Sequence, residues 1–265
     1  MKLYAQTSGV GPELVLVHGW GLHGGIWDEF VPLLETAFRV TRVDLPGHGR
    51  SVWQGQETLD AMVAAVLDTV PPRAAWLGWS LGGLVAARAA LQAPERVNAL
   101  VMLAGTPCFV RQPGWQSAML PSLLESFAAE LRDDYDHALN RFLSLQVRGS
   151  EHAGRVLRTL RAKLLAQGEP EPAALQAGLE ILRSTDLRAA GARVTCPVLL
   201  LMGERDMLVP VAAGAAAARL FPDARVVVVA GAGHAPFIQQ PQLVADHLQA
   251  FLLRQHDKRS DEVNA

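Results

Sequence analysis

The chain has 265 residues, of which 50% are hydrophobic and 19% are charged. These values predict a folded, soluble protein with one large domain, and they exclude a disordered chain. A formal net charge of −2 gives no overall indication of nucleic-acid or membrane-surface binding. The two cysteines, Cys108 and Cys196, fit neither a disulfide framework nor a metal-binding pattern, so we expect a reducing compartment. We also expect that the chemistry described below requires no metal or cofactor.

The two ends of the chain carry little hydrophobic sequence. Residues 1–7 lack the apolar segment of a signal peptide. No apolar run approaches the roughly 18–20 residues that a membrane helix needs. We therefore expect a cytoplasmic protein without a membrane span. The polar tail, residues 258–265, is expected to be disordered.

Short apolar runs alternate with helical patterns along most of the chain. Buried strands are predicted over residues 14–17, 38–45, 74–78, 97–103, 197–202 and 225–229. Helices are predicted over residues 58–70, 81–90, 211–220 and 243–253. Strands that alternate with helices imply an α/β fold, with a mostly parallel central sheet flanked by helices.

One long stretch interrupts this alternation. Between about residues 113 and 190 the pattern is helical throughout, which indicates an insertion. We therefore predict an α/β core formed by residues 1–110 and 191–257, and a helical lid formed by residues 111–190. Ligands of such sheets bind at the carboxyl ends of the strands, so the lid would cover the site.

The most informative motif is Gly-Trp-Ser-Leu-Gly at residues 78–82, which has the pattern G-x-S-x-G. A predicted strand precedes it and a predicted helix follows it. A serine in this setting occupies a tight turn that presents its hydroxyl above the strand end. Glycines flank it because side chains there would collide with neighbouring backbone. Ser80 is therefore the predicted nucleophile.

A serine nucleophile requires a base, and the base requires an orienting carboxylate. His234 follows the last predicted strand, and Asp206 follows the strand that ends at residue 202. The order Ser, acid, His fits the elbow motif. Glu204 is the nearest alternative acid. His18 and His48 are interpreted as structural residues of their loops.

Acyl transfer also requires hydrogen-bond donors for the oxyanion. The backbone N–H of Leu81 is one candidate, because it lies at the start of the elbow helix, where the helix dipole also helps. The N–H of Trp20, in the His-Gly-Trp-Gly turn at residues 18–21, is the second. The Trp20 indole is also expected to line the acyl pocket.

Four motifs together resemble those of the α/β-hydrolase superfamily. They are His-Gly-Trp-Gly at 18–21, Asp-Leu-Pro-Gly-His-Gly-Arg-Ser at 44–51, Gly-Trp-Ser-Leu-Gly-Gly at 78–83 and Gly-His-Ala-Pro-Phe at 233–237. The α/β-hydrolase fold with a helical lid insertion is therefore the expected fold class. Trp79, together with the stretches 141–146, 178–182 and 185–188, makes the chain similar to a narrower family, the pimeloyl-[acyl-carrier protein] methyl ester esterases of the biotin pathway.

That resemblance implies a substrate, a partner and a set of site residues. The substrate is a pimeloyl methyl ester carried on the phosphopantetheine arm of acyl-carrier protein. Ser80, Asp206 and His234 carry over as the triad. The implied substrate-binding residues are Trp20, Ser80, Leu81, Phe142, Leu143, Ser144, Leu145, Gln146 and His234.

The resemblance further implies that arginines of the lid dock the acidic carrier protein. Arg141 and Arg158 match this pattern, and Arg155 lies beside a position that reads Gly154 instead of the expected basic residue. Another expected basic position reads His137, so the docking surface differs in detail. We expect the chain itself to be a monomer.

Charge patterning supports the docking surface independently of the resemblance. The segment from Arg141 to Lys163 holds one acid, Glu151, and these basic residues: Arg141, Arg148, Arg155, Arg158, Arg161 and Lys163. Helical spacing puts Arg155 and Arg158 opposite an apolar face. One face would pack against the protein and the other would present positive charge, although a solvated helix face would have the same pattern.

Besides a haloperoxidase-like perhydrolase activity, two alternative functions remain open from sequence. One is a general short-chain carboxylesterase without a carrier-protein partner. The other is a non-catalytic receptor built on a hydrolase fold, which an intact triad disfavours. A dehalogenase is disfavoured because its elbow nucleophile would be aspartate, whereas this chain has Ser80.

Overall fold

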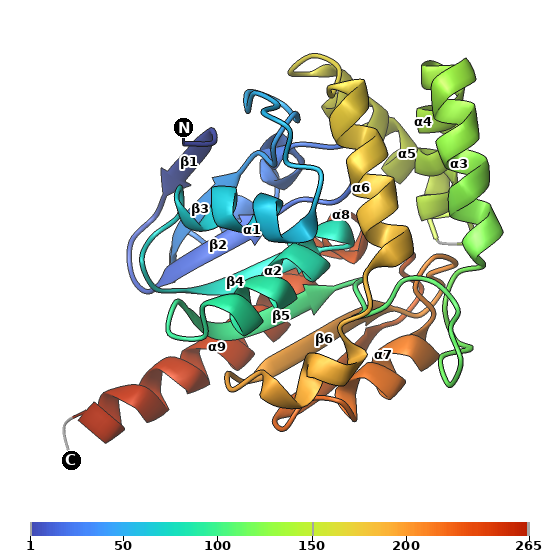
Figure 1. The fold of residues 1–265 in the computed structure, drawn as a ribbon. Helices are drawn as coiled ribbons and strands as arrows, with labels where there is room; N and C mark the ends of the chain where they lie inside the picture. Colours follow the sequence, from blue (N-terminus) through green and yellow to red (C-terminus); the bar gives the residue numbers. More distant parts are fainter. Residues whose placement is uncertain (1, 150, 264–265) are drawn as a thin grey trace.

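The computed structural model describes residues 2–149 and 151–263, and it centres on one seven-stranded sheet (Figure 1). The strand order is β1-β3-β2-β4-β5-β6-β7. The strands are β1 (Ala5–Ser8), β2 (Glu13–Val17), β3 (Arg39–Val43), β4 (Ala74–Trp79), β5 (Val97–Leu103), β6 (Val198–Gly203) and β7 (Ala224–Val229). Only β1 is antiparallel to its neighbour.

The central strands are parallel and buried because their sequences are almost entirely apolar. Every residue of β4 and of β6 is buried. This confirms the predicted mostly parallel sheet. β1 was not predicted from sequence, because its residues Ala-Gln-Thr-Ser lack an apolar pattern. It pairs only with β3 at the sheet edge.

Helices cover both faces of the sheet. Figure 1 shows α1 and α2 in front of the sheet and α9 behind it. The core helices are α1 (Leu59–Leu67), α2 (Leu81–Gln92), α7 (Val211–Ala218), α8 (Pro236–Gln239) and α9 (Pro241–Val263). Short 3₁₀ turns complete the core: η1 (Gly24–Trp27), η2 (Val31–Leu33) and η3 (Arg188–Arg193).

Four further helices lie between β5 and β6, within the range predicted to form the lid. They are α3 (Pro121–Asp133), α4 (Tyr135–Val147), α5 (Ala153–Leu165) and α6 (Pro172–Ser184). Figure 1 shows them gathered at one side of the sheet. Each helix buries one face; in α5 the buried residues are Val156, Leu160 and Leu164, all on the face that helical spacing predicted to be apolar.

The C-terminal segment differs from the prediction. α9 continues to Val263, so residues 258–263 are helical rather than disordered. Residues 242–263 contain neither glycine nor proline and are rich in straight-chain polar residues, which favour helix continuation. Residues 264 and 265 lie outside the described residues.

None of the helices in the described part of the chain is both long and apolar enough to cross a membrane.

Candidate active site

Ser80 lies at the tip of a sharp turn between β4 and α2. Its backbone has φ 56° and ψ −117°, a conformation that residues other than glycine rarely adopt. The turn is possible because a Cβ atom at Gly78 would lie 2.0 Å from the Gly82 carbonyl oxygen. A Cβ atom at Gly82 would lie 2.3 Å from the carbonyl oxygen of Val17. Both glycines are therefore sterically required, as the motif predicted.

His234 and Asp206 are brought together from loops after β7 and β6. His234 Nδ1–H donates to Asp206 Oδ2 at 2.8 Å. The other carboxylate oxygen accepts the backbone N–H groups of Leu208 and Val209, at 2.8 and 2.9 Å. This arrangement fixes the imidazole, and in its neutral form the proton lies on Nδ1 and Nε2 is the acceptor.

Glu204, the alternative acid, points elsewhere. Its Oε2 accepts the backbone N–H of Gly231 at 2.8 Å, which stabilises the loop that carries His234. That loop is held further by Trp79, whose indole N–H donates to the His234 carbonyl at 2.7 Å. Asp206, and not Glu204, is therefore the carboxylate that contacts His234.

Several polar groups of the site have no hydrogen-bond partner among the residues that the structure describes. His234 Nε2 is buried without a hydrogen bond, and no bond joins it to Ser80 within the described residues. The backbone N–H groups of Trp20 and Leu81 likewise have no acceptor recorded in the described part of the chain. Buried polar atoms are normally satisfied. The free acceptor can take the serine proton, and the two free donors can bind the oxyanion that forms when serine attacks an ester.

The lid closes this site. Ser80 is 4% exposed, His234 1% and Asp206 5%. The Trp20 indole donates to the Leu175 carbonyl of α6 at 2.8 Å. Its ring also meets Phe142 of α4 edge-on, with 4.6 Å between centroids. Trp20 therefore joins the predicted oxyanion turn to two helices of the lid.

The predicted substrate contacts on α4 divide into two groups. Phe142, Leu143 and Gln146 are buried, and the Gln146 carbonyl accepts the His234 N–H at 3.1 Å. The Gln146 side-chain oxygen is buried without a partner. By contrast, Ser144 and Leu145 are only half-buried, and the Ser144 hydroxyl donates to the Asn140 carbonyl of its own helix.

The predicted docking arginines also differ from one another. Arg141 pairs with Glu130, donates to Ser126 and lies over the Phe127 ring at 4.7 Å. Its positive charge is therefore paired with a negative charge of the lid itself. Arg155 and Arg158 on α5 are exposed, without an ion pair recorded among the described residues. Arg161, not singled out from sequence, extends the same exposed basic face of α5.

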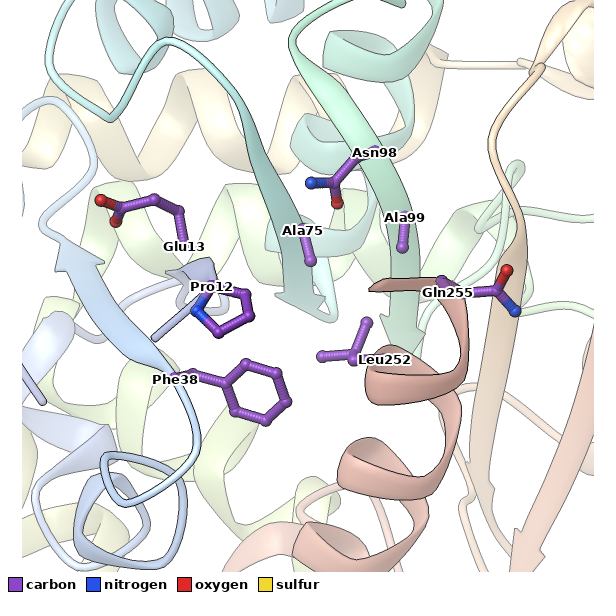
Figure 2. Close-up of a pocket in the computed structure, with 8 residues that line it drawn as sticks. All are labelled: Pro12, Glu13, Phe38, Ala75, Asn98, Ala99, Leu252 and Gln255. Atoms are coloured by element: carbon purple, nitrogen blue, oxygen red, sulfur yellow. The ribbon is translucent and has the colours of Figure 1, made fainter. Parts of the chain in front are cut away.

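A separate cavity lies at the opposite ends of the strands (Figure 2). Glu13, Ala75 and Asn98 are near the starts of β2, β4 and β5, and Leu252 and Gln255 come from α9. Its volume is about 30 Å³, enough for about one water molecule. It is too small for an acyl chain and is not connected to Ser80 by any lining residue.

Comparison with known proteins identifies the family of this chain. Residues 12–241 match the family model described as alpha/beta hydrolase fold. The chain belongs to the alpha/beta hydrolase family. Solved structures with a similar fold include an esterase from Exiguobacterium antarcticum, with a TM-score of 0.84 and 20% identity, covering 94% of each chain. A hydrolase from Pseudomonas aeruginosa has a TM-score of 0.77 and 30% identity, covering 94% of this chain and 93% of its own.

Two curated relatives of this alpha/beta hydrolase carry the same name, "Pimeloyl-[acyl-carrier protein] methyl ester esterase". The protein from Nitrosomonas europaea is 48% identical over 91% of this chain and 96% of its own length. The protein from Methylococcus capsulatus is 46% identical over 95% of this chain and 99% of its own. The sequence-based resemblance to this narrower family is thereby confirmed.

Two contacts that shape the site were not predicted from the sequence. Gly178 of α6 lies against Trp20: a Cβ atom there would be 2.6 Å from Trp20 Cδ1. The indole of Trp79 fixes the His234 loop. A glycine inside a predicted helix was the available signal for the first contact, since it indicates close packing. No local signal exists for the second, which joins residues 155 positions apart.

Proposed function

We propose that this hydrolase cleaves the methyl ester of pimeloyl-[acyl-carrier protein] methyl ester and releases pimeloyl-[acyl-carrier protein] and methanol, a step of biotin biosynthesis. The observation that carries the substrate assignment is the similarity to the esterases named above, which extends over nearly the whole chain. The unpaired acceptor and donors around Ser80 support the reaction class.

The proposed mechanism uses the triad in two half-reactions. His234 Nε2 takes the proton of Ser80 as Oγ attacks the ester carbonyl, and Asp206 stabilises the imidazolium that forms. The N–H groups of Trp20 and Leu81 bind the oxyanion. Methanol leaves with the proton from His234. Water then attacks the acyl-enzyme by the same route and gives the free carboxylate.

The proposed partner is the acidic carrier protein, which would dock on the exposed basic face of α5. Arg155, Arg158 and Arg161 supply three exposed positive charges without recorded partners in the described residues. Arg141, in contrast, already neutralises Glu130. We therefore centre the docking surface on α5 and not on Arg141.

We also propose that the protein is a monomer and that it lies in the cytoplasm. Both cysteines are buried and neither forms a disulfide, as expected in a reducing compartment. A general short-chain carboxylesterase remains the alternative function, because its triad would look the same.

Reversal of the α5 charges separates the two functions. In the variant with Arg155→Glu, Arg158→Glu and Arg161→Glu, we expect kcat/KM for the carrier-bound ester to fall by about tenfold or more. Hydrolysis of a p-nitrophenyl ester should stay within about twofold of wild type, since the triad is untouched. Steady-state kinetics on both substrates measures the difference.

Two controls complete this experiment. The variant with Arg73→Glu, Arg219→Glu and Arg225→Glu changes the same number of exposed charges away from the lid and should affect neither substrate. Ser80→Ala should remove several orders of magnitude of turnover on both substrates. Equal losses on both esters in the α5 variant, or no loss on either, would favour the general esterase.

A further inference from the structure

The Gly19–Trp20 peptide lies directly beside the nucleophile. A Cβ atom at Gly19 would be 3.3 Å from Ser80 Cβ and 3.0 Å from Trp79 Cε3. The chain contains no cis peptide among its described residues. In a planar trans peptide the carbonyl of one residue and the N–H of the next point in opposite directions. Whatever holds the Gly19 carbonyl therefore also sets the direction of the Trp20 N–H.

His18 is the group that holds this carbonyl. Its Nδ1 lies 2.8 Å from the Gly19 oxygen. The only other donor recorded for that oxygen in the described chain is the Leu22 N–H, at 3.4 Å, near the limit of a hydrogen bond. The shorter bond comes from the imidazole, so His18 is the main restraint on this peptide.

The tautomer of His18 follows from its second contact. The backbone N–H of Leu45 donates to Nε2 at 2.9 Å, so Nε2 is the acceptor. Nδ1 must then carry the proton and donate it to the Gly19 oxygen. The ring is fully buried, and Leu45 follows β3, so the imidazole bridges two loops at the carboxyl ends of β2 and β3.

We propose that His18 is a positioning residue for the oxyanion: its Nδ1–H holds the Gly19 carbonyl so that the Trp20 N–H faces Ser80. This inference rests on the serine-hydrolase chemistry proposed above but not on the carrier protein or the acyl chain. The Trp20 N–H has no acceptor recorded among the described residues, so it is available to bind an oxyanion. The orientation of the peptide plane sets the direction in which it points.

Two substitutions separate the two contacts of the ring. The amide of His18→Asn reaches approximately the position of Nδ1 and can still donate to the Gly19 oxygen. The amide of His18→Gln reaches approximately the position of Nε2, so it keeps the Leu45 contact and loses the Gly19 contact. A small p-nitrophenyl ester is the substrate, so failure of the carrier-protein proposal would not affect the result.

We expect His18→Gln to lower kcat by about 10- to 100-fold, somewhat less than complete loss of an oxyanion donor, while KM changes by less than about twofold. Affinity for a boronic acid that forms a tetrahedral adduct with Ser80 should fall by a similar factor, because the adduct needs the same donors. His18→Asn should retain most of both quantities.

His48→Asn is the matched control. This second buried histidine packs beside His18, with 5.3 Å between ring centroids, but bonds the Pro46 carbonyl instead. It should leave kcat unchanged. The inference is overturned if folded His18→Gln keeps kcat within about twofold of wild type, or if the Asn and Gln variants of His18 lose the same factor.

A measurement on the wild-type protein keeps the test valid if these variants do not fold. When the boronate oxygen accepts the Trp20 N–H, the Gly19 carbonyl becomes a stronger acceptor, because hydrogen bonds in a chain polarise one another. The His18 Nδ1–H resonance should therefore move downfield in the NMR spectrum when the boronic acid binds. An unchanged resonance in the saturated complex contradicts the inference.

Discussion

Gly178 determines how closely α6 approaches Trp20. A Cβ atom at this position would lie 2.6 Å from Trp20 Cδ1 and 3.1 Å from Nε1. The indole cannot turn away freely, because it donates to Leu175 of the same helix and packs against Phe142. We expect Gly178→Ala to destabilise the protein by about 1–3 kcal/mol through overpacking. Displacement of Trp20 should lower kcat/KM on a small ester by about tenfold.

Gly154 offers a control within the lid itself. It lies in α5, and the nearest heavy atom to a Cβ there is Arg158 Nη1 at 3.8 Å. Gly154→Ala should leave kcat/KM unchanged and raise stability by up to about 1 kcal/mol, since alanine favours the helix. Urea unfolding and ester kinetics of both variants test the contrast. Similar behaviour of the two would mean that Trp20 tolerates the extra methyl group.

His48 makes stability depend on pH. Burial lowers the pKa of His48 from 6.5 to about 4, and the pKa of His18 is lowered well below 6.5 by burial and by the neighbouring His48. Below pH 6.5 the unfolded chain binds protons that the folded chain does not bind until about pH 4. Stability is therefore complete above pH 6.5 and is lost as the pH falls. For His48 alone the loss amounts to about 3 kcal/mol.

Urea unfolding at a series of pH values between about 4.5 and 7.5 measures this loss. His48→Asn removes one titrating group, so its stability should fall less steeply with acid than that of wild type. His18 should still contribute to the slope in that variant. Parallel curves for the two proteins would show that His48 is not buried in its neutral form.

At the scale of elements, the strand ends of the site could be predicted from local sequence. Ser80, Asp206 and His234 each follow a run of apolar residues that forms a strand, namely β4, β6 and β7. The carboxyl ends of parallel strands share one edge of a sheet, so three loops distant in sequence had to meet. The hydrogen bond from His234 to Asp206 follows from that topology.

The position of each side chain within the lid could not be predicted in the same way. Arg141 is one of the predicted docking cations, and its guanidinium also pairs with Glu130 and donates to Ser126, both on α3. That pairing depends on how α3 packs against α4, and helical periodicity contains no information about such packing. β1 was missed for a related reason, because its four residues are ordered by pairing with β3 and not by their own pattern.

Backbone groups take part in several hydrogen bonds between the lid and the core, and the sequence does not reveal these bonds. Such bonds run from Trp20 to the Leu175 carbonyl, from His23 to the Lys163 carbonyl, from His234 N–H to the Gln146 carbonyl, from Glu171 N–H to the Gly47 carbonyl and from Glu151 N–H to the Gly231 carbonyl. Together they close the site over Ser80. Because Ser80 is only 4% exposed, the proposed carrier-bound acyl chain would reach it only if part of this set opened.

At the scale of the whole molecule, charge is distributed unevenly. The chain has a formal net charge of −2, yet α5 exposes Arg155, Arg158 and Arg161 on one face. An acidic carrier protein would be repelled weakly by the molecule as a whole and attracted by this face. Such complementarity acts mainly on the rate of encounter and on orientation. In the proposed docking arrangement, α5 would therefore set the direction of approach, at the side of the sheet where the lid covers Ser80.

Salt provides a test of this arrangement without any substitution. Exposed charges are screened within about 10 Å at 0.1 M salt and within about 3 Å at 1 M. We expect kcat/KM for the carrier-bound ester to fall by about tenfold between 0.05 and 0.5 M NaCl, because encounter weakens. A neutral p-nitrophenyl ester should change by less than about twofold. The α5 reversal variant should lose this salt dependence, whereas the Arg73, Arg219 and Arg225 variant should keep it. If wild type responds to salt equally on both esters, the basic face of α5 does not recruit the carrier, and the proposed docking surface is wrong even if the triad chemistry is right.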